Sequence, residues 1–292
     1  MNGEPARGSG ARRRPLVIAH RGASGVAPEN TLLAFHLAVE MGADMIELDV
    51  RCSRDGHLVV CHDPDVARTT NGHGQVHELD LDDLRRLDAG YRYSLDGQHY
   101  LFRGLGLRIP TLDEVLASLP PHIELNLEVK SPPGDGRTAE GHRIAACLAA
   151  RCRREPALVE RLLVSSFDMA VLRELRQMVP ELRTGLCTLP FDPLLRQLER
   201  VREAGLTALH PADAALGTDA ASLIEQAHRL GITVNVWTVN SVERIAELAA
   251  LGVDGIITDY PDRAVRTLGG SRESGTPSTW EQSPERGNNR PG

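Results

Sequence analysis

The stretch Leu16-Val-Ile-Ala-His-Arg-Gly-Ala-Ser-Gly25 decides between the two folds that the rest of the sequence allows. Its first five residues form a short apolar run, which is typical of a buried strand. In an open, doubly wound sheet, a Gly-x-Gly-x-x-Gly loop commonly follows the first strand and holds a phosphate. Residues 20–25 read His-Arg-Gly-Ala-Ser-Gly and do not fit that pattern, so the stretch favours a closed barrel.

The rest of the chain repeats a short apolar run followed by a segment with helical spacing. We expect strands at residues 16–20, 45–50, 123–129, 162–167, 184–189, 207–210, 233–239 and 255–258. Strands that alternate with helices predict parallel pairing with right-handed crossovers. Eight such strands match the size of a single (β/α)8 barrel of the TIM type, which typically has about 250 residues.

One region interrupts the alternation directly after the second expected strand. The turn that contains Asp55-Gly56 is too short for a parallel crossover, so the run at 57–61 is expected to return as an antiparallel hairpin. Residues 63–110 then carry turn signals and a short acidic helix near residues 80–87. We interpret them as an excursion over the active-site end of the barrel, because long loops in compact domains are usually functional or contain structure of their own.

The two ends of the chain differ in composition from its middle. Residues 1–14 and 269–292 are rich in Gly, Ser, Pro and charged residues and contain few apolar groups. Such segments cannot bury enough surface to offset the entropy of ordering. We therefore expect two disordered tails, the first of them basic, around a folded body at residues 15–268.

Charge restricts the partners of this body. The formal net charge is −7, and because residues 1–14 are basic, the body is more acidic than this total. Nucleic-acid binding needs clustered positive charge, so we expect no nucleic-acid partner. An anionic substrate would need a local cationic site. Lys130 is the only lysine among the 33 basic side chains.

No targeting or membrane segment is apparent in the sequence. The apolar stretch at 16–19 is shorter than the ~7–15 residues of a secretory signal, and no run reaches the ~18 residues of a membrane span. Five cysteines without a Cys-x-x-Cys pair favour reduced thiols. We expect a cytoplasmic protein without a stable membrane anchor, and the oligomeric state stays open.

Ionisable side chains stand at the C-terminal ends of three expected strands, as His20 and Arg21, Glu47 and Asp49, and Glu128 and Lys130. In a barrel, these ends meet at the one rim where active sites are built. Side chains alternate along a strand, so each of the last two pairs shares a face. Three carboxylates that converge without a cysteine predict a divalent cation bound by oxygen, either Mg²⁺ or Ca²⁺. The hairpin would also bring His62 beside Glu47 and Asp49.

Each of these features alone has an ordinary explanation. A single Glu-x-Asp pair is more often a solvated strand face, and a histidine at a strand end is usually a structural hydrogen-bonding group. Their repetition on several apolar strands favours a functional site, because charges in such runs are costly to bury. His210 also ends an expected strand, but it has no evident partner in the sequence and is left out of the predicted site.

Several motifs occur together in a characteristic order. They are His20-Arg-Gly22, Pro28-Glu-Asn-Thr31, Glu47-Leu-Asp49, His62-Asp63, Ile109-Pro-Thr-Leu-Asp-Glu114, Glu128-Val-Lys130, Trp237-Thr-Val-Asn240 and Gly252-Val-Asp-Gly-Ile-Ile-Thr-Asp259. In this combination the chain resembles the glycerophosphodiester phosphodiesterase family over residues 16–268. The resemblance implies a (β/α)8 barrel and an enzyme that hydrolyses glycerophosphodiesters to sn-glycerol 3-phosphate and an alcohol.

The resemblance also implies a role for each candidate residue. The residues that match the family's metal ligands are Glu47, Asp49 and Glu128, and those that match its general acid/base pair are His20 and His62. Arg21 and Lys130 match the residues that hold the phosphate, and Trp237 matches the one that lines the glycerol-binding end. Which histidine is the acid, and whether the route passes through a cyclic phosphate or direct water attack, stays open.

Two other functions agree with the same motifs. The first is a lysophospholipase D-type phosphodiesterase acting on lysophospholipids, which would need an apolar surface for an acyl chain. The excursion at 63–110 has few apolar runs that look exposed, and this favours water-soluble diesters. The second is a barrel that binds phosphate esters without turnover. The complete set of candidate ligands and histidines favours an enzyme.

Overall fold

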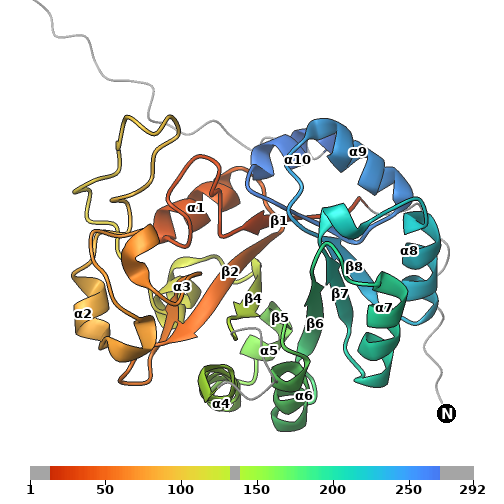
Figure 1. Ribbon diagram of the computed structural model, residues 1–292, viewed down its shortest axis with the longest axis horizontal. Coiled ribbons are helices and arrows are strands. Elements are labelled where there is room, and N and C mark those ends of the chain that lie inside the picture. Colours follow the sequence, from red (N-terminus) through yellow and green to blue (C-terminus); the bar gives the residue numbers. More distant parts are fainter. Residues whose placement is uncertain (1–13, 132–138, 270–292) are drawn as a thin grey trace, which may run out of the picture.

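The computed structural model describes residues 14–131 and 139–269, so nearly all of both predicted tails lies outside the described residues. Within these ranges the strands form one sheet, which curls into the centre of the molecule in Figure 1. The strands are β1 (Leu16–His20), β2 (Met45–Cys52), β3 (Leu58–Val60), β4 (Glu124–Val129), β5 (Leu162–Ser166), β6 (Arg183–Thr188), β7 (Ala208–Pro211), β8 (Thr233–Val236) and β9 (Gly255–Thr258).

Eight of these strands close into a parallel ring, and β3 lies outside it. The ring runs β1-β9-β8-β7-β6-β5-β4-β2, and β1 closes it by pairing with β2. β3 pairs with β2 in the antiparallel sense, with Val60 opposite Val50 and Leu58 opposite Cys52. These pairings confirm the predicted (β/α)8 barrel and the hairpin after its second strand.

Helices alternate with the strands and cover the outside of the ring (Figure 1). The α-helices are α1 (Leu32–Glu40), α2 (Leu81–Arg85), α3 (Leu112–Ser118), α4 (Ala139–Arg154), α5 (Leu158–Arg161), α6 (Met169–Met178), α7 (Leu194–Glu203), α8 (Ala220–Arg229), α9 (Val242–Leu251) and α10 (Pro261–Thr267), and the 3-10 turns are η1 (Val66–Arg68), η2 (Val76–Glu78) and η3 (Asp213–Ala215). Every helix among the described residues is too short or too polar to cross a bilayer.

Side-chain caps fix where several helices begin. At the start of α3, the hydroxyl of Thr111 accepts a hydrogen bond from the Glu114 amide at 3.1 Å, and the Glu114 carboxylate accepts one from the Thr111 amide at 2.7 Å. This reciprocal pair satisfies two amides that a helix start would otherwise leave unpaired. Asp168 and Ser241 cap α6 and α9, and each side chain accepts one hydrogen bond from a backbone amide of its helix.

Alternation along the strands divides the side chains between the inside and the outside of the ring. Outward-facing residues such as Leu125 and Val234 pack against the helices in two buried clusters. On the inside, Ile18, Met45 and Ile257 form a small apolar cluster against which Trp237 packs. The opposite half of the interior is polar, with buried side chains of Asn126, Ser165, His210 and Asn235. The barrel interior is therefore apolar on one side and polar on the other.

The segment after β3 has a small core of its own. Val59, Val76, Leu84 and Ile109 are fully or almost fully buried in this cluster, which lies beside β2 at the left of Figure 1. The exposed large apolar side chains of this excursion are separate residues and do not form the apolar runs considered in the sequence. Leu95, Leu101 and Leu105 lie in its long loop and are 64–76% exposed. Turn signals hide such leucines in a sequence, because they interrupt any regular apolar pattern.

The observed strands begin and end within two residues of the predicted ones, apart from the seventh of the eight strands predicted along the sequence. This strand, β8, ends at Val236, whereas the prediction extended it to Val239. The Trp237 amide donates to the Pro211 carbonyl at 3.1 Å, and the Trp237 carbonyl accepts from the Asp213 amide at 2.6 Å. These contacts form an isolated parallel bridge between Ala212 and Trp237, in the register of the β7–β8 pairing but beyond the end of the strand.

Candidate active site

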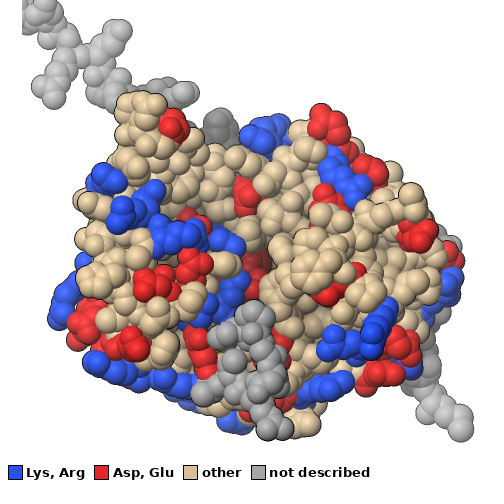
Figure 2. Space-filling model, in the orientation of Figure 1, with Lys and Arg blue, Asp and Glu red and all other residues tan. Residues whose placement is uncertain are grey.

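Seven of the eight side chains predicted for the site line one cavity of about 120 Å³, at the C-terminal ends of the barrel strands. The eighth, Asp49, is fully buried and forms an ion pair with Lys130, which lines the cavity. Figure 2 shows acidic and basic side chains gathered around a hollow near the middle of this face. Cavities of about 500 and 760 Å³ lie outside the ring against α3 and α4, away from these residues.

A tight turn after β1 presents the first two site residues. Arg21 has a φ of 56° and Gly22 a φ of 82°, so two consecutive residues adopt the left-handed conformation. A side chain at position 22 would place its Cβ 2.6 Å from the Ala34 carbonyl carbon, and therefore only glycine fits there. A non-glycine residue such as Arg21 adopts this conformation at a cost, which is commonly a feature of functional sites. The turn directs the Arg21 amide to the Glu47 carboxylate at 2.9 Å.

The three predicted metal ligands converge. One carboxylate oxygen from each of Glu47, Asp49 and Glu128 lies within 4.8 Å of the others. Register explains this, because Asp49 on β2 is the direct partner of Glu128 on β4. Burial and the neighbouring Asp49 charge raise the pKa of Glu47 to about 8. Burial also opposes ionisation of Asp49, but the charges of Lys130 and Arg21 outweigh it and hold the pKa of Asp49 well below its ordinary value.

Two cations face these carboxylates. The Lys130 amine lies 2.8 Å from one Asp49 oxygen and also forms an ion pair with Glu128. The Arg21 guanidinium lies 3.3 Å from the other Asp49 oxygen and donates to Glu29 at 2.9 Å. Burial lowers the pKa of Lys130, but its two carboxylate partners outweigh this and raise it above the ordinary value. Both cations therefore stay charged at physiological pH.

The carboxylate group fits a divalent cation. Within the described ranges, the Glu47 oxygen Oε1 is buried and has no hydrogen-bond partner. A buried polar atom left unpaired costs roughly 1–3 kcal/mol, so such an atom in a native site calls for a partner. The donors are all carboxylate oxygens, which Mg²⁺ and Ca²⁺ prefer. A cation shared by Glu47, Asp49 and Glu128 would supply that partner and relieve the repulsion that raises the pKa of Glu47.

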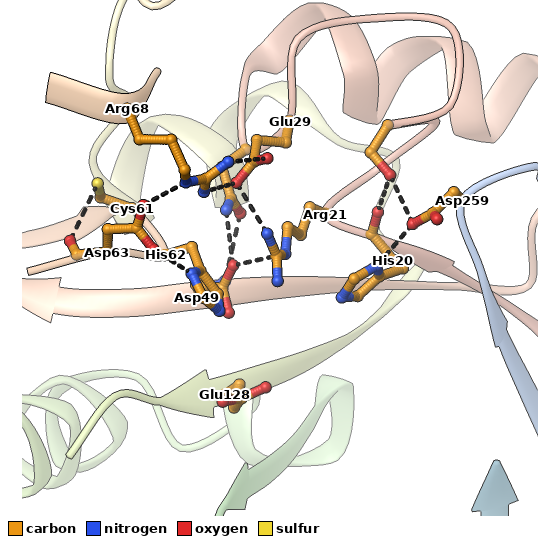
Figure 3. A network of polar contacts seen from close by, with 12 residues as sticks. His20, Arg21, Glu29, Asp49, Cys61, His62, Asp63, Arg68, Glu128 and Asp259 are labelled. Carbon is orange, nitrogen blue, oxygen red and sulfur yellow. Dashed lines mark hydrogen bonds and ion pairs between the residues drawn. The ribbon is translucent and has the colours of Figure 1, made fainter. Parts of the chain in front are cut away.

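His20 is oriented by a carboxylate at the end of the last strand. Its Nδ1 lies 2.6 Å from Asp259 Oδ1, a contact drawn at the right of Figure 3. Asp259 in turn accepts from the Asn240 amide at 2.6 Å and from the Ser24 hydroxyl at 3.0 Å. Burial lowers the pKa of His20, but the hydrogen bond to Asp259 and the charge of Glu47 outweigh it and raise the pKa.

His62 also has a carboxylate behind it, but that carboxylate is shared with an arginine. His62 Nδ1 lies 2.6 Å from Asp63 Oδ1, and Asp63 forms an ion pair with Arg68. Arg68 also binds Glu29, which links it to Arg21 (Figure 3). Burial, together with the charges of Lys130 and Arg21, outweighs the attraction of Asp49 and lowers the pKa of His62. The hairpin places His62 in the lining of the cavity.

Trp237 forms the apolar wall of the cavity. Its indole nitrogen donates to the His210 carbonyl at 2.8 Å, and its ring meets Phe167 edge to face at a centroid distance of 5.6 Å. Both rings and Ile257 line the cavity. Trp237 therefore lines the cavity, with an orientation fixed by the backbone of the neighbouring strand.

The predicted site lacks two sets of residues, namely the polar wall of the cavity and the carboxylates that orient the histidines. Asn126, Ser165 and His210 line the cavity from the polar half of the barrel. Alternation with Glu128 could have identified Asn126, which lies two residues before it on β4. Asp63 and Asp259 stood within quoted motifs but received no role. His210 appeared to lack a partner because Asn235, whose amide nitrogen lies 3.0 Å from His210 Nε2, is 25 residues away.

Comparison with known proteins gives a consistent result. Residues 20–263 match the glycerophosphoryl diester phosphodiesterase family. The chain is 39% identical over 265 residues to a glycerophosphodiester phosphodiesterase from Caldanaerobacter subterraneus subsp. tengcongensis, covering 87% of this chain and 98% of the relative. It is 33% identical over 264 residues to one from Bacillus subtilis, covering 85% of each chain. It is also similar to the structure of an Oleispira antarctica phosphodiesterase in complex with the product sn-glycerol-3-phosphate, with a TM-score of 0.73 and 30% identity over 88% of this chain and 97% of that one.

Proposed function

Because the chain belongs to the glycerophosphoryl diester phosphodiesterase family, and is thus a phosphoric diester hydrolase, we propose that it cleaves glycerophosphodiesters to sn-glycerol 3-phosphate and an alcohol. One observation carries the proposal. Three carboxylates, two cations and two histidines, each histidine backed by a carboxylate, surround one cavity of about 120 Å³ or lie directly beside it. The Oleispira relative, whose structure holds sn-glycerol-3-phosphate, supports the product.

In this proposal, Glu47, Asp49 and Glu128 hold one Mg²⁺ or Ca²⁺ ion. When bound, the cation supplies positive charge that stabilises the negative charge gathering on the phosphoryl oxygens. Arg21 and Lys130 bind the remaining phosphate oxygens. Their ion pairs with Asp49 hold both side chains in place before substrate arrives, so little reorganisation is needed at the moment of reaction.

His20 and His62 move the protons. Overall, a P–O ester bond breaks, the oxygen of water bonds to phosphorus, and the departing alcohol oxygen receives a proton. One histidine takes a proton from the attacking oxygen and the other gives one to the alcohol, as suits imidazoles that titrate near neutral pH. The attacking oxygen belongs either to water or to the neighbouring glycerol hydroxyl, in which case a cyclic phosphate is opened by water in a second step.

A matrix of substrates and cations tests this function. The purified protein is treated with chelator, resupplied with Mg²⁺, Ca²⁺, Mn²⁺ or Zn²⁺, and assayed for release of glycerol 3-phosphate from glycerophosphocholine and glycerophosphoethanolamine. We expect turnover only after resupply. Full activity in excess chelator would contradict the proposed requirement for a divalent cation. Absence of turnover with every cation would contradict the proposed hydrolysis of glycerophosphodiesters.

A pair of matched variants separates the proposed cation ligand from a general effect of charge. Glu47→Gln removes one proposed ligand oxygen at nearly constant shape, and we expect a higher cation concentration for half-maximal activity. Glu199→Gln makes the same chemical change on the exposed face of α7, where Glu199 pairs only with Arg202 among the described residues. It should leave the cation dependence unchanged. Equal behaviour of the two variants would remove Glu47 from the ligand set.

A further inference from the structure

The strand pairing that returns the chain to the barrel ends before it reaches His62. β3 pairs with β2 as far as Val60, which lies opposite Val50. One further backbone contact follows, in which the Cys61 amide donates to the Asp49 carbonyl at 3.0 Å. His62 itself lies beyond the ladder, in a segment without regular secondary structure. Because a displacement of about 1 Å can cost a catalytic group much of its effect, this segment needs a further attachment.

A buried arginine on β2 supplies this attachment. Arg51 lies two residues after Asp49 and is 5% exposed. Its Nε and Nη2 both donate to the His62 carbonyl oxygen, at 3.0 and 2.8 Å. Its Nη1 donates to the Glu140 carboxylate at 2.6 Å. The planar fork of the guanidinium allows the three hydrogen bonds to form at the same time, so this one side chain joins the barrel strand to the backbone of His62.

Glu140 holds the guanidinium of Arg51 from the first turn of α4. Its side chain is 15% exposed, so the ion pair is largely removed from water and weakly screened. α4 packs against both β2 and β3. One turn further along this helix, Arg143 donates to the Arg54 carbonyl, in the turn between the two strands, at 2.7 Å. Two charged side chains of α4 therefore brace the hairpin, one at its turn and the other, through Arg51, at its active-site end.

Two charged groups hold different parts of His62. Asp63 contacts the ring through Nδ1 at 2.6 Å, but it is the next residue in the chain and therefore orients the ring within its own segment. Arg51 holds the backbone from which the ring projects. Arg51 also belongs to the strand that carries Glu47 and Asp49. Its contact with the His62 carbonyl thus fixes the segment relative to the proposed cation ligands, which the contact with Asp63 does not do.

We propose that Arg51, held by Glu140, is a positioning residue that fixes the place of His62 relative to the phosphate and cation site. This inference rests on the proposed function, because it concerns the placement of one of its proton-transferring groups. Arg51 does not line the cavity and acts only through the backbone of His62. Without its hydrogen bonds the imidazole would occupy unproductive positions for part of the time. We therefore expect loss of Arg51 to lower kcat and to change substrate binding little.

Replacement of the guanidinium tests the proposal. Arg51→Met removes all three donors, and we expect kcat for glycerophosphocholine to fall about 10–100-fold while KM changes less than about threefold. Arg51→Lys keeps the charge but loses the fork and should give an intermediate kcat. Arg161→Met is the matched control, because Arg161 Nε and Nη2 also donate to a single carbonyl oxygen, that of Ile123, at 3.4 and 3.3 Å. Ile123 directly precedes β4, at the opposite rim of the barrel, so kcat should be unchanged.

A double-mutant cycle distinguishes a positioning role from a purely structural one. If Arg51 acts through His62, Arg51→Met should lower kcat no further in a His62→Ala background, whereas its effect should persist in a His20→Ala background. A purely structural loss would be the same in both backgrounds. The rates are followed with glycerophospho-p-nitrophenol, whose coloured product allows slow turnover to be measured. An equal loss of kcat in the wild-type and His62→Ala backgrounds would overturn the proposal.

Hydrogen exchange tests the attachment independently of turnover. Deuterium uptake by peptides that contain Cys61 and His62 should be faster in Arg51→Met than in the wild type, and unchanged in Arg161→Met. This result would support the attachment even if no diester were hydrolysed, so failure of the proposed function is distinguishable from failure of this inference. Unchanged uptake in Arg51→Met, or a kcat within about twofold of the wild type, would each overturn the proposal.

A second variant keeps the test valid if Arg51→Met does not fold. Removal of one partner of a buried ion pair leaves the other charge without compensation, which is strongly destabilising. The double variant Arg51→Met/Glu140→Gln leaves no unpaired carboxylate at this place, and the same fall in kcat, the same dependence on His62 and the same faster exchange are expected of it. A double variant with the kcat and exchange of the wild type would overturn the proposal.

Discussion

The His20 side and the His62 side of the site look alike but carry different charge. Each histidine places its Nδ1 at 2.6 Å from a carboxylate oxygen. Asp259, behind His20, is held by the neutral groups of Asn240 and Ser24, whereas Asp63, behind His62, is shared with the cationic Arg68. The pKa of His20 is raised, because Asp259 and the charge of Glu47 outweigh burial, whereas the pKa of His62 is lowered by burial and by the charges of Lys130 and Arg21.

The difference teaches that the charges facing two similar histidine–carboxylate pairs can decide the direction of each pKa shift, since Glu47 raises the pKa of His20 whereas Lys130 and Arg21 lower that of His62. An aspartate with neutral neighbours directs its full negative charge at the imidazole and favours the protonated ring. An aspartate already paired with an arginine mainly fixes the ring's orientation. On this basis His20 suits the role of proton donor to the departing alcohol, and His62 suits that of base. The predictions below test the contrast, starting with the largest effect.

Removal of either histidine should have the largest effect. We expect His20→Ala and His62→Ala each to lower kcat for glycerophosphocholine by about 10²–10⁴, the usual contribution of general acid–base catalysis. A substrate whose leaving group is p-nitrophenol needs no proton donor. On it, His20→Ala should recover most of the lost rate and His62→Ala should not. Recovery in both variants, or in His62→Ala alone, would contradict the assignment. Circular dichroism controls for folding.

Replacement of the aspartates that contact the two histidines should have smaller effects, and the two effects should be unequal. Asp259→Asn keeps the shape but removes the charge behind His20, and we expect kcat to fall about 10–100-fold, as is typical for groups that orient a catalytic residue. Asp63→Asn should have a smaller effect, because Arg68 already offsets much of that charge. The check is a steady-state comparison in which KM changes little. Equal losses of kcat would remove the contrast between the two sides.

Lys130 belongs electrostatically to the His62 side, since its charge contributes to the lowered pKa of His62. Arginine keeps the charge, but its planar fork is longer than the compact amine between Asp49 and Glu128. We expect Lys130→Arg to lower kcat/KM on the order of tenfold with an unchanged fold, and Lys130→Met to lower it further. Near-normal activity of the arginine variant would show that charge alone suffices at this position.

His210 provides a reference histidine without a carboxylate. Burial lowers its pKa in the folded protein to about 4, below the ~6.5 of an exposed histidine. The unfolded chain therefore binds an extra proton as the pH falls from about 6.5 to 4, and the free energy of unfolding decreases in that window, by up to about 3 kcal/mol at 1.36 kcal/mol per unit. Urea unfolding of wild type and His210→Phe at pH 7 and pH 5 checks this. The variant should lose less stability on acidification, and equal losses would contradict the prediction.

The sequence predicted the barrel and most of the charged site because both follow from short-range rules. Alternation of apolar runs with helical spacing predicts the strands, and the position of Glu47, Asp49 and Glu128 near strand ends predicts their convergence. The Asp55-Gly56 turn predicted the return of the chain that brings His62 to the site, and β3 confirms that return.

The rest depends on contacts between distant segments. Asp259 lies 239 residues from His20, and no spacing rule connects them. Of the polar wall, alternation with Glu128 indicates Asn126 alone, whereas Ser165 and His210 come from two other strands and share with it only an inward direction. The exposed leucines of the excursion depend on loop packing, for which residue patterns give no period.

The single lysine has a practical meaning beyond its place in the site. Lys130 is 12% exposed and held by Asp49 and Glu128, and its raised pKa keeps the amine protonated. Reagents that acylate lysine side chains therefore meet one slow target in this sequence, and that target is in the proposed phosphate site. The rate of acylation reports how strongly Asp49 and Glu128 shield the amine and whether the site is occupied. It does so without any engineered label.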